Sequence, residues 1–100
     1  MKLNFKIQVK EKDKIIVRDA VVEKYDDLTY YLSPRFKGNE NLKYAIYDKN
    51  TGLAIALSTN KADVIKKYES LLEAYKSFRE SKAYEKMIKE YKSLCEKVDD

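Results

Sequence analysis

Residues 61–98 read KADVIKKYESLLEAYKSFRESKAYEKMIKEYKSLCEKV, and this stretch decides between two architectures. Its apolar residues recur at spacings of three and four, which is typical of amphipathic helices. They form two stripes: Val64, Ile65, Tyr68, Leu71, Leu72, Tyr75 and Phe78, then Tyr84, Met87, Ile88, Tyr91, Leu94, Cys95 and Val98. At about 100° per residue, the second stripe points roughly 150° away from the first.

The mismatch between the stripes leaves two alternatives open. The chain can break within 79–83 and fold back, with Ser81 capping a second helix that packs on the first helix or the sheet edge. Alternatively, one straight helix of about 57 Å exposes the second stripe to a partner. No Gly or Pro within 61–98 forces a break. We interpret the stretch as two helices and keep the straight helix as the alternative.

The N-terminal part of the chain predicts a hairpin. Residues 3–10 alternate between apolar and polar side chains, which indicates a half-buried antiparallel strand. A polar turn at 11–14 leads to a second strand over 15–22, where the alternation slips near Asp19 and predicts a bulge or bend. The side chains expected to face the core from the first strand are Leu3, Phe5, Ile7 and Val9.

A second hairpin is predicted over 42–47 and 53–58, with Gly52 taking a positive φ in the turn. The residues expected to share one core face are Leu42, Tyr44, Ile46, Leu53, Ile55 and Leu57, and those expected on the opposite face are Ala45, Ala54 and Ala56. Such small side chains permit close approach by a helix, a loop or a partner, and we interpret them as a small-residue solvent face with close approach as the alternative. Between the hairpins, residues 23–32 fit a short helix or a strand, and we interpret them as a short helix followed by a loop over 33–41.

Together these elements predict an α+β fold in the order β-β-(α)-β-β-α-α. A small antiparallel sheet of about four strands would pack with C-terminal helices. We expect one domain over 1–100, with a sheet region over 1–58 and a helical region over 59–98. Residues 58–60, Ser-Thr-Asn, supply caps for the first helix, and Asp63 suits its first turn.

The sequence contains no recognisable catalytic motif. It has no histidine, which removes the commonest general base, the usual serine and cysteine triads and most zinc sites. Neither common phosphate-binding glycine loop is present. We interpret the adjacent carboxylates at 26–27 and 99–100 as solvated charges and Cys95 as a small buried apolar residue. We therefore expect a protein that is not an enzyme and has no metal, cofactor or small-molecule substrate.

The sequence also predicts a cytoplasmic protein. Met1 is followed by a strand-like segment instead of a basic region and an apolar core, so we expect no signal peptide. The longest apolar run, 53–57, is far shorter than a membrane span of about 20 residues. The bias toward Lys, Tyr, Ile, Asn and Glu indicates an AT-rich gene from a low-GC bacterium, or from a phage or plasmid living in one.

The segment Ser58-Thr59-Asn60-Lys61-Ala62, with Lys66-Lys67 one turn later, follows the second hairpin. In this it resembles the last strand and helix of double-stranded RNA-binding domains and the arm-binding domains of phage integrases. The basic run that those families carry at the helix start is missing, and Asp63 stands among the expected basic positions. The resemblance implies a shared supersecondary pattern, and we transfer no function from it.

Two functional hypotheses follow. The first is a small inhibitor or regulator of a phage or mobile element, similar as a class to anti-CRISPR proteins, which occludes a protein partner or forms a homodimer through its C-terminal helix. Its expected contact residues are Tyr84, Met87, Ile88 and Tyr91. The alternative is a nucleic-acid-binding module that uses Lys6, Lys10, Lys12, Lys14, Arg35 and Lys37. The net charge is only +4, and acidic residues are mixed among the basic ones.

Overall fold

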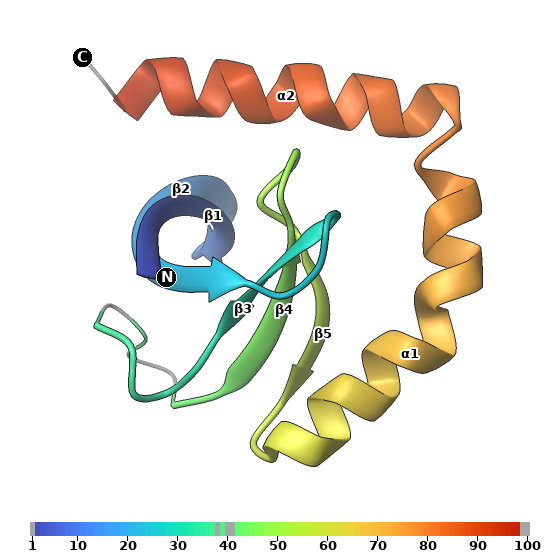
Figure 1. Cartoon of the computed structure of the whole chain (residues 1–100). Helices are drawn as coiled ribbons and strands as arrows, with labels where there is room; N and C mark the ends of the chain where they lie inside the picture. The colour runs from blue at the N-terminus through green and yellow to red at the C-terminus, as the bar shows by residue number, and fades with distance from the viewer. Residues whose placement is uncertain (1, 38, 40–41, 99–100) are drawn as a thin grey trace.

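The computed structural model describes residues 2–37, 39 and 42–98, and for Lys97 and Val98 it describes the backbone only. An antiparallel meander is followed by two helices (Figure 1). The elements are β1 (Lys2–Glu11), β2 (Lys14–Lys24), β3 (Thr29–Leu32), β4 (Tyr44–Asp48), β5 (Ala54–Ser58), α1 (Lys61–Phe78) and α2 (Lys82–Val98). The predicted α+β class is confirmed, with five strands in the described chain and sheet order β1-β2-β3-β4-β5.

The short helix expected within 23–32 is wrong, because these residues end β2, turn and form β3. The carboxylate of Asp26 organises the turn: Oδ1 accepts hydrogen bonds from the Leu28 N–H at 2.8 Å and the Thr29 hydroxyl at 2.7 Å. Its Oδ2 accepts from the Tyr68 hydroxyl of α1 at 2.6 Å. An aspartate that binds the backbone two residues on favours a turn over a helix.

The β1–β2 hairpin is long and strongly curved, and it is seen almost end-on as a ring in Figure 1. Its register runs without a shift from Lys2↔Glu23 to Glu11↔Lys14, so the bulge expected near Asp19 is wrong, while the curvature supplies the bend. The broken alternation has another cause. Val17 and Ala20 point to opposite faces of β2 and both are buried, so the buried face changes along the strand.

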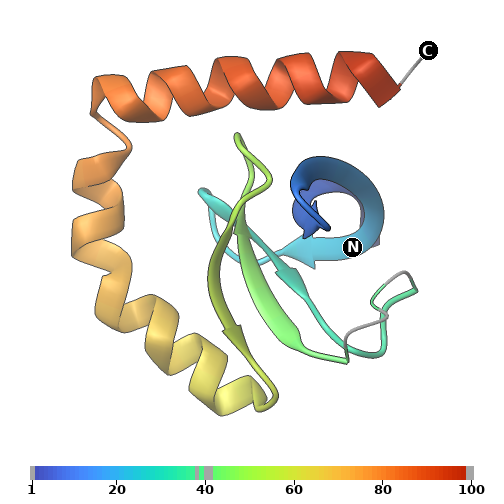
Figure 2. The same ribbon diagram turned by 180° about the vertical axis from the view of Figure 1, so that it is seen from behind.

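Two apolar clusters lie on opposite sides of the β3–β4–β5 sheet, between the curved hairpin and α1 (Figures 1 and 2). The hairpin-side cluster is Phe5, Ile7, Ala20, Val22, Leu32, Ala45 and Tyr47, and the α1-side cluster is Tyr31, Ile46, Ala56, Val64, Tyr68 and Tyr75. The central strand β4 is therefore covered on both faces.

The pairing of β4 with β5 also differs from the prediction. The register shifts between Ile46 and Tyr47, so Ile46 pairs with Ala56 and Ala45 pairs with Leu57. The expected common core face is therefore split, and Leu42 and Leu57 are exposed. The small-residue solvent face is also wrong for two of its three members: Ala45 lies in the hairpin-side cluster and Ala56 in the α1-side cluster, while Ala54 is exposed.

The helix α1 begins where the sequence predicts. The Asn60 side chain accepts a hydrogen bond from the Asp63 N–H at 3.2 Å, and the Ser58 hydroxyl donates to Asp63 Oδ2 at 2.7 Å. These bonds satisfy the start of a helix. From there α1 buries Val64, Tyr68 and Tyr75 of the first stripe against the sheet.

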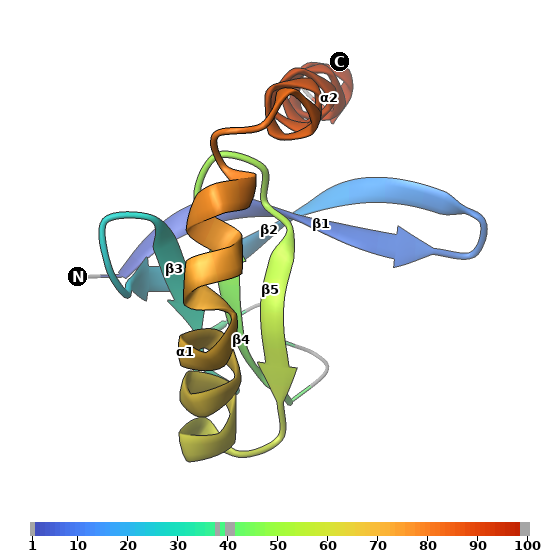
Figure 3. The same cartoon turned by 90° about the vertical axis from the view of Figure 1, so that its right-hand side faces the viewer.

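The helical region is interrupted by Arg79–Ser81, so it is not one straight helix. The Ser81 hydroxyl oxygen accepts from the Tyr84 N–H at 3.2 Å and thereby caps α2. After this elbow α2 turns sharply away from the direction of α1 and runs over the tip of the β4–β5 hairpin and past the β1–β2 hairpin (Figures 1 and 3). It therefore packs on the sheet region rather than back along α1.

The tip of the β4–β5 hairpin meets β1 and α2 at Gly52. The Gln8 N–H donates to the Gly52 carbonyl oxygen at 2.8 Å, which links the first strand to this turn. Gly52 has a φ of +67°, and a Cβ atom added there would lie 2.7 Å from the Lys6 carbonyl oxygen and 2.7 Å from Cε1 of Tyr91. Glycine is thus required both by the backbone conformation and by the close approach.

We expect Gly52→Ala to lower the free energy of unfolding by about 2–4 kcal/mol. The methyl group would be strained at a positive φ, and it would also clash with the Lys6 carbonyl oxygen and the Tyr91 ring. Urea denaturation followed by circular dichroism measures this change. Lys49→Ala, an exposed side chain in the same turn, serves as the control and should shift stability by less than about 0.5 kcal/mol. Equal stability of the two variants would show that the turn does not pack on β1 and α2.

Candidate functional site

In the described part of the second stripe, Tyr84 is buried and the other side chains are half-buried. Tyr84 is only 4% exposed, and its hydroxyl donates to Asp48 Oδ1 at 3.0 Å. The Tyr91 hydroxyl donates to the Lys6 carbonyl oxygen at 2.6 Å, and its ring centroid lies 6.3 Å from that of Phe5. Met87 and Ile88 are half-buried. Of the four expected contact residues, the two tyrosines thus attach α2 to the sheet region.

A buried polar cluster surrounds the elbow between the helices. The Arg79 guanidinium lies 3.8 Å from the Asp48 carboxylate, and its Nη1 donates to the Tyr75 hydroxyl at 3.0 Å and the Leu28 carbonyl at 3.3 Å. Burial, together with the hydrogen bond to Asp48, raises the pKa of Tyr84 to about 12. Burial also raises the pKa of Tyr75 well above its usual range. Both tyrosines are therefore neutral at physiological pH.

This elbow cluster adjoins a cavity of about 150 Å³, lined in part by Phe78 and Met87. In the described chain, every buried side-chain nitrogen or oxygen has a hydrogen-bond partner. The Asp48 carboxylate lies 3.8 Å from the Arg79 guanidinium and accepts hydrogen bonds from the Tyr84 hydroxyl and the Asn50 N–H. We interpret the cluster as the structural connection that fixes the direction of α2.

The structure separates the six basic residues of the alternative hypothesis. Lys6 is paired with Asp19 at 3.0 Å. Lys10, Lys12 and Lys14 are exposed together around the turn of the β1–β2 hairpin. Arg35 and Lys37 are exposed in the β3–β4 loop, where the Lys37 carbonyl accepts from the Val21 N–H near the opposite end of that hairpin. The six residues therefore do not form one surface.

The turn end of the β1–β2 hairpin projects well beyond the rest of the molecule (Figure 3). We call residues 10–15 the arm, and all of them are exposed. Ile15 carries the largest apolar side chain of the arm and is 57% exposed. An isolated aliphatic side chain among charged ones at a projecting tip is a suitable anchor for a partner surface.

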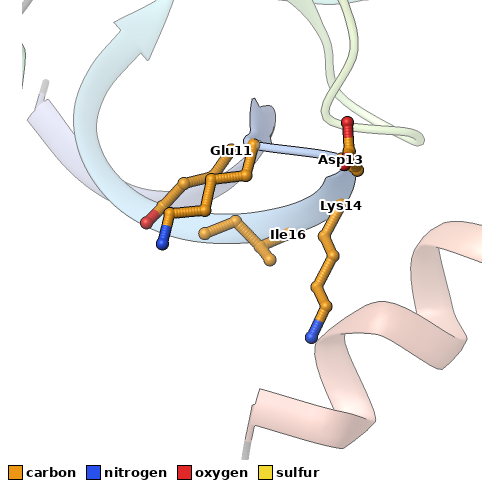
Figure 4. A pocket seen from close by; sticks show the side chains of 5 residues that line it. Glu11, Asp13, Lys14 and Ile16 are labelled. Carbon is orange, nitrogen blue, oxygen red and sulfur yellow. The ribbon is translucent and has the colours of Figure 1, made fainter.

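Residues of the arm, together with Ile16, line an open hollow of about 360 Å³ (Figure 4). It is lined by Glu11, Lys12, Asp13, Lys14 and Ile16, and Figure 4 shows the aliphatic Ile16 between the polar Glu11 and Lys14. Carboxylates and amines alternate here, so the hollow itself does not favour a ligand of one charge.

A second hollow, which we call the groove, has a volume of about 270 Å³ and lies between β1, the β3–β4 loop and β5. Its lining is Gln8, Val9, Lys10, Leu32, Asn39, Lys43, Ala45, Tyr47, Ala54 and Leu57. The buried residues Leu32, Ala45 and Tyr47 supply an apolar floor. Lys10 and Lys43 are exposed at the rim, and the described lining contains no acidic residue.

Sequence reasoning missed the arm as a separate feature and missed the groove entirely. The lengths of the strands carry a signal for the arm: β1 and β2 have 10 and 11 residues, whereas β4 and β5 have 5 each, so the longer pair must overhang. The groove joins residues from three distant segments and has no such local signal.

Comparisons with protein-family models, with curated proteins and with solved structures gave no match to this chain. None of the helices in the described residues is long and apolar enough to cross a membrane. The same residues contain no cluster of three or more Cys, Asp or Glu side chains that could hold a metal ion.

The buried tyrosines predict a loss of stability at alkaline pH. The pKa of Tyr68 and that of Tyr84 both rise from 10.0 to about 12 on folding, chiefly through burial. Because the unfolded chain ionises first, the stability that these groups contribute is present below pH 10 and is lost as the pH rises from 10 to about 12. Urea denaturation at a series of pH values, with tyrosinate absorbance recorded in parallel, measures this loss.

The control for this titration is Tyr84→Phe, which removes one of the shifted groups. We expect its unfolding free energy to fall less steeply with pH over the same interval. An identical slope in the variant and the parent protein would contradict the burial of Tyr84.

Proposed function

We propose that this chain is a non-catalytic binding protein that acts by occluding a surface on another macromolecule. The observation that carries the proposal is the arm, which extends past the body of the protein and presents exposed Ile15 at its tip (Figure 3). We assign the contact to the arm rather than to α2, because Tyr84 is buried and the Tyr91 hydroxyl is bonded to β1, whereas Ile15 is 57% exposed.

The chemistry of the arm specifies the surface it would fit. Ile15 is flanked by Lys14 in sequence and paired with Lys10 across the hairpin. Such an arrangement, an apolar anchor inside a polar rim, is typical of protein interfaces. The complementary site is an apolar depression bordered by carboxylates. Glu11 and Asp13 at the turn add specificity, since they oppose a uniformly acidic partner.

We further propose that the partner belongs to a bacterial host and that this chain is a small inhibitor or regulator carried by a phage or mobile element, in the functional class that includes anti-CRISPR proteins. Support comes from the residue bias that indicates an AT-rich gene and from a projecting element that can block a site without chemistry. This role requires the chain to act in the bacterial cytoplasm.

A nucleic-acid-binding module is the second candidate, and the grouping of Lys10, Lys12 and Lys14 on the arm favours it. Phosphate contacts by these lysines would make binding strongly dependent on salt. Glu11 and Asp13 stand between the lysines, and no arginine lies on the arm for bidentate contacts. We therefore rank it below a protein partner.

The arm is tested with Ile15→Asp, matched by Leu71→Asp on the exposed side of α1. The two leucine-sized side chains are 57% and 45% exposed, so both variants should keep the parent circular dichroism and melting temperature. A partner captured from the host is purified, and its dissociation constant is measured with each variant. We expect Ile15→Asp to weaken binding at least about tenfold and Leu71→Asp less than about twofold.

Equal binding by the two variants would contradict the role of the arm. The second candidate would replace the first if DNA or RNA were recovered instead of a protein. Its affinity would then fall steeply as the salt concentration rises, and it would also fall in the Lys12→Ala variant.

A further inference from the structure

The outer edge of β1 faces away from β2 and is paired only along part of its length. The Gln8 N–H bonds Gly52 and the Lys6 carbonyl accepts from Tyr91, so both groups point away from β2. Alternate residues of an antiparallel strand present their main-chain groups to the same side. The N–H and C=O of Lys10 therefore point outward as well, and they have no main-chain partner among the described residues.

The opposite wall of the groove is protected. The β5 edge is partly covered from α1, because Lys67 Nζ donates to the Leu57 carbonyl oxygen at 3.2 Å. The sheet begins at β1 and ends at β5, and Gln8 of β1 reaches the β4–β5 turn through two hydrogen bonds, from its N–H to the Gly52 carbonyl oxygen and from its side-chain amide to the Thr51 carbonyl oxygen. Beside these bonds the groove stays open, with the unpaired stretch of β1 along one wall.

The side chains around this edge favour an anionic, partly apolar occupant. Lys10 and Lys43 place two ammonium groups at the rim, and the described lining offers no carboxylate to neutralise them. Leu57 is 46% exposed beside a floor of Leu32, Ala45 and Tyr47. An occupant with alternating acidic and apolar side chains would meet both features, since successive side chains of a strand point to opposite faces.

We propose that the groove binds an extended acidic polypeptide segment, which adds as a short strand to the outer edge of β1 at Lys10. The main-chain groups of Lys10 hydrogen-bond the segment, its acidic side chains lie by Lys10 and Lys43, and its apolar side chains rest on the floor. This inference rests on the proposed function, because it describes a second contact with the same kind of partner, a protein.

A single-stranded nucleic acid fits these features less well. Its binding sites combine a cationic track with exposed aromatic rings on which bases stack. The one aromatic residue in the described lining, Tyr47, is buried, and the rim has two lysines and no arginine. The free main-chain groups of a strand edge also match a peptide backbone rather than a phosphate chain.

The probe is a fluorescein-labelled octapeptide of alternating glutamate and valine, titrated with the full chain and followed by anisotropy. We expect saturable binding, with new protection of the Lys10 amide from hydrogen exchange. Lys43→Glu and Leu57→Glu should each weaken binding at least about tenfold, because they place a carboxylate beside the acidic segment. Lys76→Glu, an exposed substitution on α1, is the matched control and should change affinity less than about twofold.

Three comparison probes separate the alternatives. A lysine–valine octapeptide should bind at least about tenfold more weakly, and so should an acidic octapeptide N-methylated at alternate backbone nitrogens. Absence of binding by the acidic probe, or equal binding of the acidic and basic probes, overturns the proposal. Tighter binding of a thymidine octanucleotide, lost in Lys43→Glu, overturns it in favour of nucleic acid.

The two proposals fail separately. If Ile15→Asp abolishes binding of the macromolecular partner while Lys43→Glu and Leu57→Glu leave it unchanged, the proposed function stands and the groove has no part in it. If the acidic octapeptide binds as expected but Ile15→Asp leaves partner binding intact, the groove stands and the role of the arm is rejected.

Discussion

The close approach at Gly52 brings the β4–β5 turn, β1 and α2 together. At this point the carbonyl oxygen accepts from Gln8 of β1, and the ring of Tyr91 from α2 occupies the space where a side chain would stand. One residue without a Cβ atom therefore joins the last hairpin, the first strand and the final helix. Because the contact holds β1 near Gln8, the curved hairpin covers one face of β4 while its far end remains outside the body.

The elbow cluster determines how α2 reaches that contact. Arg79 lies beside Asp48, Tyr75 and Tyr84, and thus connects the end of α1 to the end of β4. A buried ion pair adds little net stability, but removing one partner leaves the other charge buried without compensation. We therefore interpret this pair as fixing the geometry of the elbow. The offset between the apolar stripes has the same origin: the first faces the sheet under α1, and the second faces the β4–β5 turn and β1.

Much of this fold is encoded locally and was predictable from the sequence. The alternation of residues 3–10, the turn at Gly52 and the cap at Asn60 each correspond to features of the structure. The strand Thr29–Leu32 was not predictable, because four residues are too few to establish a period and the deciding interaction is the turn held by Asp26. The register shift between Ile46 and Tyr47 was also not predictable, because it places Leu57 on the opposite face of the sheet without any change in the local sequence pattern.

The candidate site, like the fold, contains features that were predictable from the sequence and features that were not. The exposure of Lys10, Lys12 and Lys14 follows from a polar turn and was expected. The identity of the anchor was not, because Ile15 looks like any other strand residue until the overhang of β1 and β2 beyond the body is known. The groove depends on residues from Gln8 to Leu57 that only the curved hairpin brings together. Tyr84 and Tyr91 fit an interface as well as a core by type, and only the position of α2 separates the two.

The helix α2 packs on the sheet region through Tyr91, and we therefore propose the arm and the groove, rather than α2, as the surfaces for a partner. The most direct measurement is a nuclear Overhauser effect between the ring protons of Tyr91 and the α protons of Gly52 in the isolated protein. We expect a strong cross-peak and α-proton resonances displaced by the ring current of Tyr91. Absence of the cross-peak, with Gly52 α protons at ordinary shifts, would show that α2 stands away from the sheet and would contradict the account.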